Sequence, residues 1–373
     1  KAFALNNDLG LTSVGPAAPL VDGVGDSFTA AGLQCVGPMR GAAQLEGSKA
    51  FTTDFLARPG IPTANYANFT DVDDALAYLQ ETGAPVVVKA DGLAAGKGVI
   101  VAMTLEEAEA AVRDMLAGNA FGEAGHRVVI EEFLDGEEAS FIVMADGKHV
   151  LPMATSQDHK RVGDGDTGPN TGGMGAYSPA PVVTDTIYQR IMEEVIEPTV
   201  KGMAAEGNPY TGFLYAGLMI MADGTPKVIE YNCRFGDPET QPIMLRMRSD
   251  LVAHCIAALE GKLDTQTALW EERSALGVVM AAGGYPGSYA SGDVVSGLPE
   301  QEAGETKVFH AGTKVEDDAV VTAGGRVLCV TALGNSVSEA QRKAYELVDT
   351  ISWDGAFCRH DIGYRAIARE EES

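Results

Sequence analysis

Apolar and polar positions repeat with a helical period in two stretches of the first half of the chain. Residues 71–82 and 104–117 carry apolar side chains at this spacing and begin with acidic turns, which predicts two amphipathic helices. The run 85–90 between them is apolar except for Lys89, a pattern typical of a buried strand. Further strands are expected at 11–14, 35–36, 99–101, 128–132, 139–144, 213–221 and 228–231, and further helices at 22–31, 184–206 and 336–350. This mixture predicts an α/β chain with α+β character.

Apolar positions become sparse between residues 157 and 178. This stretch is rich in glycine and aspartate, so it is expected to form a long loop. Loops of this length in compact domains are usually functional or disordered. The run Gly168–Gly175 would let backbone amides surround a small carboxylate, and the competing interpretation of the loop is plain solvation.

The chain length of 373 residues exceeds what one hydrophobic core usually supports, which predicts two or three domains. Residues 1–48 are typical of the end of an α/β domain whose beginning is absent. The composition changes near residue 270, after which short strands alternate with Gly- and Pro-rich turns. We therefore expect a remnant of an N-terminal α/β domain over 1–48, a central domain over 49–270, and a small mixed α/β domain over 271–373.

The formal net charge of −26 argues against nucleic acid and anionic membranes as partners. It leaves ATP open, because a local cluster of basic side chains and backbone N–H groups can bind phosphate on an acidic protein. The five cysteines are scattered without a C-x-x-C pair, which argues against a zinc site or a disulfide framework. No apolar run is long enough to span a bilayer. The cysteine pattern fits a reducing cytoplasm best.

Polar groups concentrate at the end of the expected strand 228–231. Glu230 and Asn232 alternate onto one face, and a carboxylate beside an amide oxygen suits a hard cation such as Mg²⁺. Arg234 follows at once, and a tight turn then exposes the carboxylate of Asp237. The alternative is a polar strand exit with a surface salt bridge.

A glycine-rich stretch follows the strand that carries Lys89. Gly96 and Gly98 allow the backbone to approach a phosphate closely, and Lys97 adds positive charge. The stretch does not fit a Walker A loop, because Gly98 stands where that loop has Ser or Thr. A hairpin that folds over phosphates fits better, and a simple β-turn is the alternative. Lys89 needs an anionic partner because a buried lysine is costly alone, and either a phosphate or a carboxylate of the protein would serve.

One expected strand ends at Glu131 and Glu132, and the next begins near Glu138. Phe133 and Leu134 lie in the short connection between them. Backbone groups at such a hinge could pair with the edge of a base, and a carboxylate could hold ribose hydroxyls. A solvated acidic turn is the competing interpretation.

In their order along the chain, these motifs resemble the phosphoribosylamine–glycine ligase family of ATP-grasp enzymes. The resemblance covers essentially the whole chain. Its most specific blocks are Gly168–Gly175 and Glu230–Gln241, which separate this family from most other ATP-grasp enzymes. The other matching blocks are Gly47–Lys49, Lys89–Val99, Glu131–Leu134, Gln157–Arg161, Gly312–Thr313, Gly324–Arg326 and Arg359–Tyr364.

The resemblance implies an ATP-grasp fold over 49–270, with a Rossmann-like substrate domain before it and a lid over residues 64–135 that closes on ATP. It also implies ATP-dependent joining of glycine to 5-phosphoribosylamine through glycyl phosphate. The products are glycinamide ribonucleotide, ADP and phosphate, in de novo purine biosynthesis.

Roles for individual residues follow from the same resemblance. The implied catalytic residues are Lys89, Lys97 and Arg234, and the implied ligands of Mg²⁺ or Mn²⁺ are Glu230 and Asn232. The implied ATP contacts are Lys49, Lys89, Gly96, Lys97 and Gly98 at the phosphates, Glu131, Glu132, Phe133 and Leu134 at adenine, and Glu138 at the ribose. The expected substrate contacts are Asp158, Lys160, Asn170, Thr171, Gly172 and Asp237.

Two departures from the family pattern concern the 5-phosphoribosylamine site. The glycine-rich segment with which family members begin is not in this sequence, and Ala17 stands where they typically have an acidic residue. The chain is accordingly expected either to bind ATP with poor turnover or to be part of a longer protein. Another ATP-grasp carboxylate–amine ligase and a non-catalytic nucleotide-binding fragment stay open as alternatives, as does a monomer or a dimer.

Overall fold

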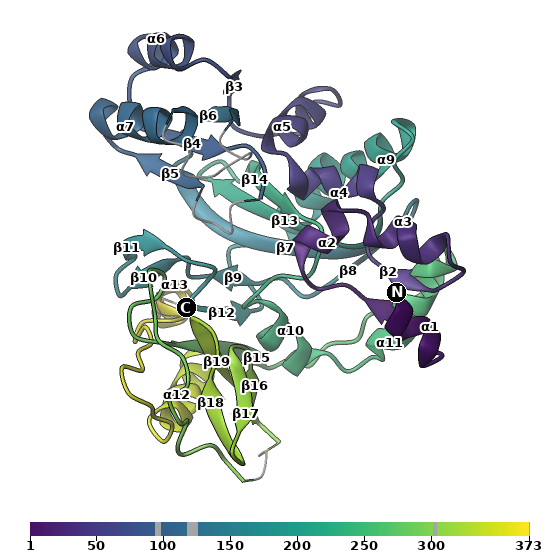
Figure 1. The fold of residues 1–373 in the computed structure, drawn as a ribbon, viewed down its shortest axis with the longest axis vertical. Helices are drawn as coiled ribbons and strands as arrows, with labels where there is room; N and C mark the ends of the chain where they lie inside the picture. The colour runs from purple at the N-terminus through teal and green to yellow at the C-terminus, as the bar shows by residue number, and fades with distance from the viewer. Residues whose placement is uncertain (94–97, 118–125, 301–303, 373) are drawn as a thin grey trace. The chain divides into compact units, whose positions relative to one another are not determined.

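Two structural units make up the chain, and each is built from three separate segments (Figure 1). The computed structural model describes residues 1–93, 98–117, 126–300 and 304–372. Unit 1 comprises Lys1–Pro152, Val182–Phe235 and Asp250–Thr267, and unit 2 comprises Met153–Pro181, Gly236–Ser249 and Ala268–Ser373. The division into domains at residues 48 and 270 stays a prediction. Within the described ranges, no helix is both long and apolar enough to cross a membrane.

The N-terminal part of unit 1 pairs two short strands in parallel. β1 (Thr12–Ser13) and β2 (Cys35–Val36) lie side by side, which confirms the strands expected at these positions. The helix expected over 22–31 is present but shorter, as α3. The helices of this part are α1 (Ala2–Asn6), α2 (Ala17–Val21), α3 (Val24–Thr29), α4 (Arg40–Gly47) and α5 (Lys49–Ala57). Only Ser48 separates α4 from α5, and its side chain caps α5 by accepting the Phe51 N–H.

A four-stranded antiparallel sheet with the order β3-β6-β4-β5 follows. Its strands are β3 (Tyr66–Phe69), β4 (Val86–Ala90), β5 (Val99–Ala102) and β6 (Val128–Glu132). The two helices α6 (Val72–Thr82) and α7 (Leu105–Leu116) share a core with this sheet (Figure 1). Asp71 caps α6, and Thr104 with Glu107 forms a capping box on α7. Both predicted amphipathic helices are therefore confirmed, together with the strand that carries Lys89.

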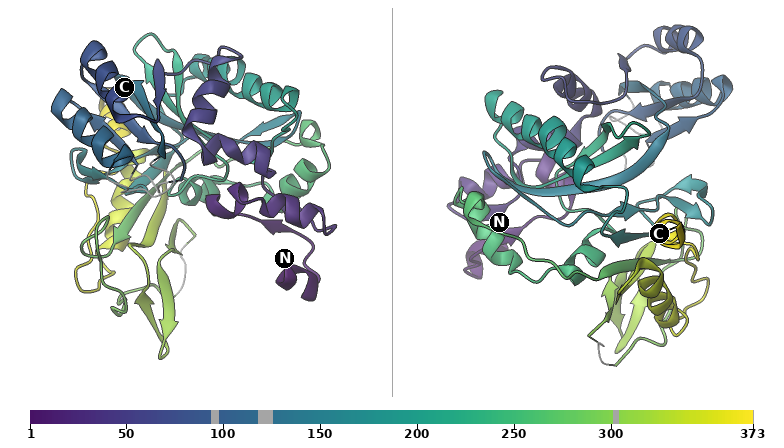
Figure 2. Two further views of the ribbon diagram at one scale, coloured as in Figure 1. Left: turned by 45° about the horizontal axis from the view of Figure 1, so that its top comes forward. Right: turned by 180° about the vertical axis from the view of Figure 1, so that it is seen from behind.

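The second sheet of unit 1 has the order β14-β13-β7-β8. Its strands are β7 (Gly136–Asp146), β8 (Val150–Pro152), β13 (Thr211–Met221) and β14 (Pro226–Asn232). The helices of this part are α8 (Asp185–Ile191), a π-helical segment (Met192–Ile196), α9 (Glu197–Ala205), α11 (Leu251–Leu259) and a 3₁₀ turn (Leu263–Thr265). Figure 2 shows the stretch from α8 to α9 lying across one face of the sheet, where its apolar side chains join the main core. The helix expected over 184–206 is thus confirmed, and its π-helical segment ends two residues before Pro198, which has no N–H to donate.

Unit 2 is organised around a five-stranded sheet with the order β16-β19-β15-β12-β9. Its strands are β9 (Gln157–Asp158), β12 (Gly175–Ser178), β15 (Ser274–Ala281), β16 (Thr306–His310) and β19 (Arg326–Gly334). Two hairpins accompany it, β10 (Arg161–Gly163) with β11 (Thr167–Asn170) and β17 (Thr313–Glu316) with β18 (Ala319–Thr322). Its helices are α10 (Thr240–Arg246), α12 (Val337–Val348) and α13 (Tyr364–Glu372). The helix expected over 336–350 is confirmed as α12, which shares its core with β15 and β19.

The long loop expected over 157–178 is wrong, because this segment contains β9, β10, β11 and β12. These strands are only two to four residues long and lack an alternation of apolar and polar positions. β12 pairs with β9 on one side and with β15 on the other. Since β15 begins at residue 274, the local sequence carries no sign of this partner.

Candidate active site

Charged side chains and one amide, from several elements of unit 1, gather near the end of β14. They come from α4, the start of α5, β4, β6 and β14 itself, so residues far apart in sequence contribute to one group. The group consists of Glu46, Lys49, Lys89, Asp91, Glu131, Glu230, Asn232 and Arg234. Six of these eight residues carry roles implied by the sequence.

Lys89 lies in the interior of this group and is 4% exposed. Its Nζ atom is 2.6 Å from Oε2 of Glu131, and it donates a hydrogen bond of 2.9 Å to the carbonyl of Ile229. Lys89 thus joins β4 and β6 of one sheet to β14 of the other. Of the two partners considered for this lysine, the structure contains the protein carboxylate.

Lys49 is the first residue of α5, and its Nζ atom donates to the carbonyl of Gly92 at 2.9 Å. Burial lowers the pKa of Lys49, while the nearby Glu230 carboxylate partly offsets this effect. Ser48 donates to Asp91 Oδ1 at 2.9 Å, and the same oxygen accepts the Ala50 N–H. The start of α5 is therefore bonded to the beginning of the connection between β4 and β5.

That connection was expected to be a phosphate-binding hairpin. β4 and β5 are antiparallel neighbours with Lys89 opposite Val99, so the hairpin itself is confirmed. The carbonyl of Gly98 accepts the Ala90 N–H at 2.8 Å. Gly96 and Lys97 lie outside the described residues, and the contact with phosphate stays a prediction.

Glu230 and Asn232 lie two residues apart on β14, so their side chains leave the same face of the strand. Oδ1 of Asn232 accepts a hydrogen bond of 3.2 Å from Nη2 of Arg234, whose Nη1 donates to the Phe235 carbonyl at 3.0 Å. Among the described residues, no three His, Cys, Asp or Glu side chains are grouped as a complete metal site. A carboxylate and an amide oxygen nevertheless fit Mg²⁺ or Mn²⁺, because such ions commonly take one or two protein carboxylates and complete their shell with substrate phosphates and water.

Glu46 belongs to this group but was not predicted. Its Oε2 atom accepts the Cys233 N–H at 2.7 Å, and its Oε1 atom lies 3.5 Å from Nη2 of Arg234. Burial raises the pKa of Glu46 despite the nearby Arg234 guanidinium. One local signal could have found it, because Glu46 directly precedes the Gly47–Lys49 block.

The residues expected at adenine and ribose follow the passage from β6 to β7. Glu131 is bound to Lys89, and Oε2 of the exposed Glu132 accepts from Nδ2 of Asn65 at 2.9 Å. Leu134 is buried and Phe133 is half-buried. The half-buried Glu138 lies on β7.

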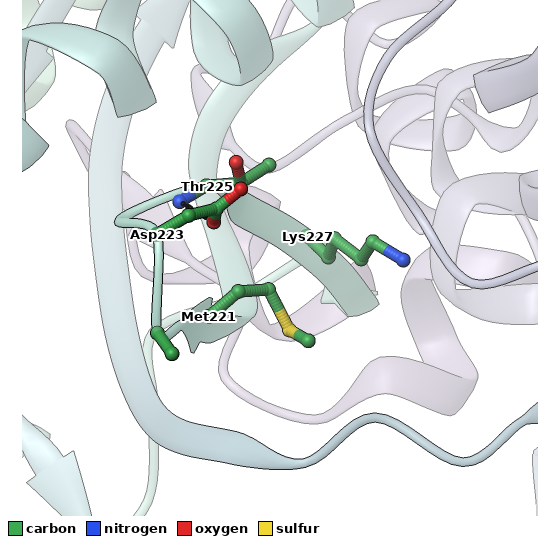
Figure 3. Close-up of a pocket in the computed structure, with 5 residues that line it drawn as sticks. Met221, Asp223, Thr225 and Lys227 are labelled. Carbon is green, nitrogen blue, oxygen red and sulfur yellow. Dashed lines mark hydrogen bonds between the residues drawn. The ribbon is translucent and has the colours of Figure 1, made fainter.

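A cavity of about 380 Å³ lies at the hairpin between β13 and β14 (Figure 3). It is lined by Met221, Ala222, Asp223, Thr225 and Lys227. None of these residues was predicted for the site. Lys227 connects this cavity to a predicted adenine contact, because its Nζ atom lies 3.7 Å from Oε2 of Glu132.

In unit 2, two of the residues expected to contact substrate, Gly172 and Asp237, are bound by Arg326. Nη2 of Arg326 is 2.7 Å from Oδ2 of Asp237, and Nη1 donates to the Gly172 carbonyl at 2.7 Å. Thr171 donates through its N–H and its hydroxyl to the carbonyl of Lys160 at 2.7 and 2.9 Å. Tyr285 accepts the Gly172 N–H at 3.0 Å. The sequence did not predict Arg326 or Tyr285 as site residues, although Arg326 ends one of the blocks that resemble the family.

The other expected substrate residues lie on neighbouring strands. Asp158 lies on β9 opposite Ala176, and Asn170 lies on β11 opposite Arg161. Gly173 has a φ of +110°, and a Cβ atom there would lie 2.3 Å from Pro238 Cδ. Only glycine at position 173 therefore lets the connection between β11 and β12 approach the turn that carries Asp237.

A second polar cluster in unit 2 holds the 157–175 segment to the chain near residue 360. The fully buried Arg359 side chain donates to Asp166 Oδ1 and to both carboxylate oxygens of Asp361, each at 2.8 Å. Burial alone would raise the pKa of Asp361, but hydrogen bonds from Arg359 and the Gly165 N–H outweigh it and lower the pKa to about 2.

His159 is a buried connector in the same region. The Gly363 N–H donates to its Nε2 atom at 3.0 Å, so the Nδ1–H donates to the Gly175 carbonyl at 3.1 Å. Burial lowers the pKa of His159 to about 4, and the nearby Arg359 acts in the same direction. Neutral His159 is thus a structural residue that joins the Gly175 carbonyl to the Gly363 N–H.

Comparison with known proteins identifies the family. Family models of the N, ATP-grasp (A) and C domains of phosphoribosylglycinamide synthetase match residues 1–46, 47–240 and 275–365. The chain belongs to the phosphoribosylglycinamide synthetase family. A family member from Escherichia coli O6:H1, named phosphoribosylamine–glycine ligase, is 76% identical over 370 residues, which are 99% of this chain and 86% of that protein. The predicted family is therefore confirmed.

Solved structures confirm the ATP-grasp fold of this phosphoribosylglycinamide synthetase family member. The crystal structure of phosphoribosylamine–glycine ligase from Thermotoga maritima has a TM-score of 0.81 at 36% identity, over 88% of this chain and 82% of that one. The biotin carboxylase domain of 2-oxoglutarate carboxylase from Hydrogenobacter thermophilus has a TM-score of 0.74 at 17% identity, over 95% of this chain and 77% of that one. The second likeness concerns the fold alone.

Proposed function

We propose that this chain catalyses the ATP-dependent ligation of glycine to 5-phosphoribosylamine. The products are glycinamide ribonucleotide, ADP and phosphate, in purine biosynthesis. The observation that carries the proposal is the convergence of Lys49, Lys89, Glu230, Asn232 and Arg234 in one charged group of a chain that belongs to this ligase family. Binding alone would not need this combination of cations and oxygen ligands.

The reaction needs activation of a carboxylate, because its oxygen is otherwise a poor leaving group. A glycine carboxylate oxygen attacks the γ-phosphorus of ATP, the bond to ADP breaks, and glycyl phosphate forms. The amine of 5-phosphoribosylamine then attacks the carbonyl carbon, phosphate leaves with the C–O bonding electrons, and the nitrogen loses a proton. Both steps depend on alignment and charge neutralisation more than on a protein nucleophile.

The side chains of unit 1 supply these effects. Lys49 and Lys89 bring ammonium groups to the phosphates, and the Lys89 ammonium is already fixed between Glu131 and the Ile229 carbonyl. Arg234 is oriented by Asn232 and the Phe235 carbonyl, and its guanidinium stabilises the transferring phosphoryl group. Glu230 and Asn232 would hold Mg²⁺ or Mn²⁺, which neutralises phosphate charge when bound. Lys97, Gly96 and Gly98 are proposed to close over the same phosphates.

The base and the sugar of ATP are assigned to the passage between the two sheets. We propose that Glu131–Leu134 contacts adenine and that Glu138 binds the ribose hydroxyls. The half-buried Phe133 and the buried Leu134 support an apolar surface for the base. Residues 64–135 would act as the lid over the nucleotide.

Glycine and 5-phosphoribosylamine are assigned to unit 2. We propose that Asp158, Lys160, Asn170, Thr171, Gly172 and Asp237 contact these substrates. The support is that Thr171, Gly172 and Asp237 lie within one hydrogen-bonded arrangement around Arg326. The Asp237 side chain is 53% exposed, so its carboxylate is accessible to a substrate ammonium group.

The test measures ADP release by the full chain with Mg²⁺-ATP and glycine. 5-Phosphoribosylamine is generated in the assay from ribose 5-phosphate and ammonia, and each component is omitted in turn. The expected result is ADP formation that requires both glycine and the phosphoribosylamine-generating mixture. ADP release that responds to another amino acid or amine, but not to this pair, would overturn the proposal.

We further propose that the protein works in the cytoplasm on small molecules, as a monomer or a dimer. The support for a reducing compartment is that all five cysteines are free thiols and that four of them are buried. Chromatography with light scattering decides the oligomeric state, and restoration of EDTA-treated enzyme by Mg²⁺ or Mn²⁺ decides the metal.

A further inference from the structure

Glu46 is a carboxylate without an assigned role at the centre of the charged group in unit 1. It lies near the end of α4, and only 8% of its side chain is exposed. Both carboxylate oxygens face the chain that leaves β14: one accepts the Cys233 N–H and the other faces Arg234. A carboxylate in such a place is costly unless its partners are fixed, so its contacts carry information.

α4 holds Cys233, the residue between Asn232 and Arg234, through two kinds of contact. The backbone of Cys233 donates to Glu46, and its Sγ atom lies 3.6 Å from the Ala43 carbonyl and 3.8 Å from the Ala42 carbonyl. The Cys233 side chain is fully enclosed in the main core. The exit of β14 is therefore fixed relative to α4, and Glu46 is its charged contact.

The same short segment also reaches the connection after β4. Two residues after Glu46, Ser48 bonds to Asp91, and Lys49 bonds to the Gly92 carbonyl. Gly47 permits this compact arrangement, because a Cβ atom there would lie 2.9 Å from Cγ1 of Val21 on α2. Residues 46–49 thus link the strand that carries Glu230 and Asn232 to the start of the glycine-rich hairpin.

We propose that Glu46 is a positioning residue that orients Arg234 for phosphoryl transfer. The inference rests on the proposed function of Arg234. The Arg234 guanidinium donates to Asn232 Oδ1 and to the Phe235 carbonyl, and Glu46 supplies an anionic partner. The carboxylate thereby fixes the direction of the guanidinium and balances its charge before ATP binds.

The test is a double-mutant cycle with Glu46→Gln and Arg234→Met. Glutamine keeps an acceptor for the Cys233 N–H and removes only the negative charge opposite Arg234. We expect Glu46→Gln to lower kcat by about 10- to 100-fold, as for other outer-shell partners, with the KM for ATP changed less than about twofold. In the Arg234→Met background, the same substitution is expected to change kcat by less than about twofold.

Three results would overturn this role. They are an unchanged kcat in Glu46→Gln, an effect confined to the KM for ATP, or a kcat of the double variant that equals the product of the two single losses, which means additive free-energy effects. The melting temperature of each variant is measured alongside, and Glu46→Asp provides a variant that keeps the charge should Glu46→Gln unfold. A partial recovery of kcat in Glu46→Asp supports positioning, and a loss as large as that of Glu46→Gln contradicts it.

Glu206→Gln is the matched control, because Glu206 makes an ion pair of 2.7 Å with Arg58 at the surface. It is expected to leave kcat unchanged. Turnover of the unmodified chain in the same assay separates the two proposals: its absence contradicts the ligase function, whereas its presence with additive effects contradicts only the role of Glu46.

Discussion

Lys89 and Glu131 form an ion pair of 2.6 Å in the interior of unit 1, with less than a tenth of either residue exposed. The two residues lie on the adjacent strands β4 and β6, and Lys89 also reaches the Ile229 carbonyl on β14. The pair thus holds an ammonium group at the junction of two sheets. Such a buried pair orients a charge more clearly than it stabilises the fold, because desolvation offsets much of the attraction.

Replacing one partner of this pair is therefore expected to be costly. Lys89→Met leaves the Glu131 carboxylate buried without its cation and is predicted to lower the free energy of unfolding by about 3–5 kcal/mol. Urea denaturation followed by fluorescence measures this change. Lys201→Met is the control, since it removes an exposed pair with Glu197 and should cost less than about 1 kcal/mol.

The double variant Lys89→Met/Glu131→Leu separates stability from catalysis. It should regain most of the lost stability because no buried charge remains, yet it should not regain ADP release. Recovery of activity in this variant would remove Lys89 from the catalytic residues.

Glu230→Gln is predicted to lower turnover by about 100-fold or more, because metal positioning fails while the rest of the nucleotide site persists. ADP release gives the rate, and calorimetry with ADP gives the affinity, which should change much less. Glu194→Gln, which alters a pair with Arg190 on the stretch from α8 to α9, is the control and should keep normal rates. Normal activity of Glu230→Gln would falsify the metal assignment.

Arg326→Lys is predicted to raise the KM for glycine about tenfold without changing the KM for ATP. Lysine cannot reproduce the two-atom contact of the guanidinium with Asp237 and the Gly172 carbonyl, and charged hydrogen bonds contribute about 1.5–3 kcal/mol. Initial rates at varied glycine concentrations measure the effect. Arg342→Lys, which affects only an exposed pair with Glu346 on α12, should match the unmodified chain. Equal KM values for glycine in the two variants would contradict a role of Asp237 at that substrate.

His159 is expected to make stability depend on pH in the mildly acidic range. Its folded-state pKa of about 4 lies below the ordinary value of 6.5, so the unfolded chain binds the proton more readily. The stabilising contribution is complete above about pH 6.5 and is lost as the pH falls towards 4, amounting to about 3 kcal/mol. Urea denaturation at several pH values should show a smaller decrease for His159→Gln than for the unmodified chain. Identical decreases would exclude this histidine as their source.

The sequence was sufficient wherever the signal is local. The helices α6 and α7 follow from the spacing of their apolar residues and from their acidic first turns. The strand with Glu230 and Asn232 is equally local, because alternation alone puts the two side chains on one face. These features required no knowledge of distant residues.

Long-range partners account for what the sequence could not supply. Glu46 and Cys233 are 187 residues apart, and Gly172 and Arg326 are 154 apart, so nothing near either position points to the other. The sequence predicts that Lys89 has an anionic partner, but that this partner is Glu131 depends on how β4 pairs with β6. For the same reason β12 was missed, since its partner β15 lies far along the chain.

The interleaving of the two units has a consequence for synthesis on the ribosome. All three segments of unit 1 have been made once residue 267 is complete, whereas β12 still lacks β15, with which it pairs from Gly175 to Ser178. A nascent or prematurely stopped chain of that length would present an unpaired strand edge to its neighbours. Open edges of this kind recruit other strands, so such a chain is expected to need a chaperone until residues 274–281 emerge.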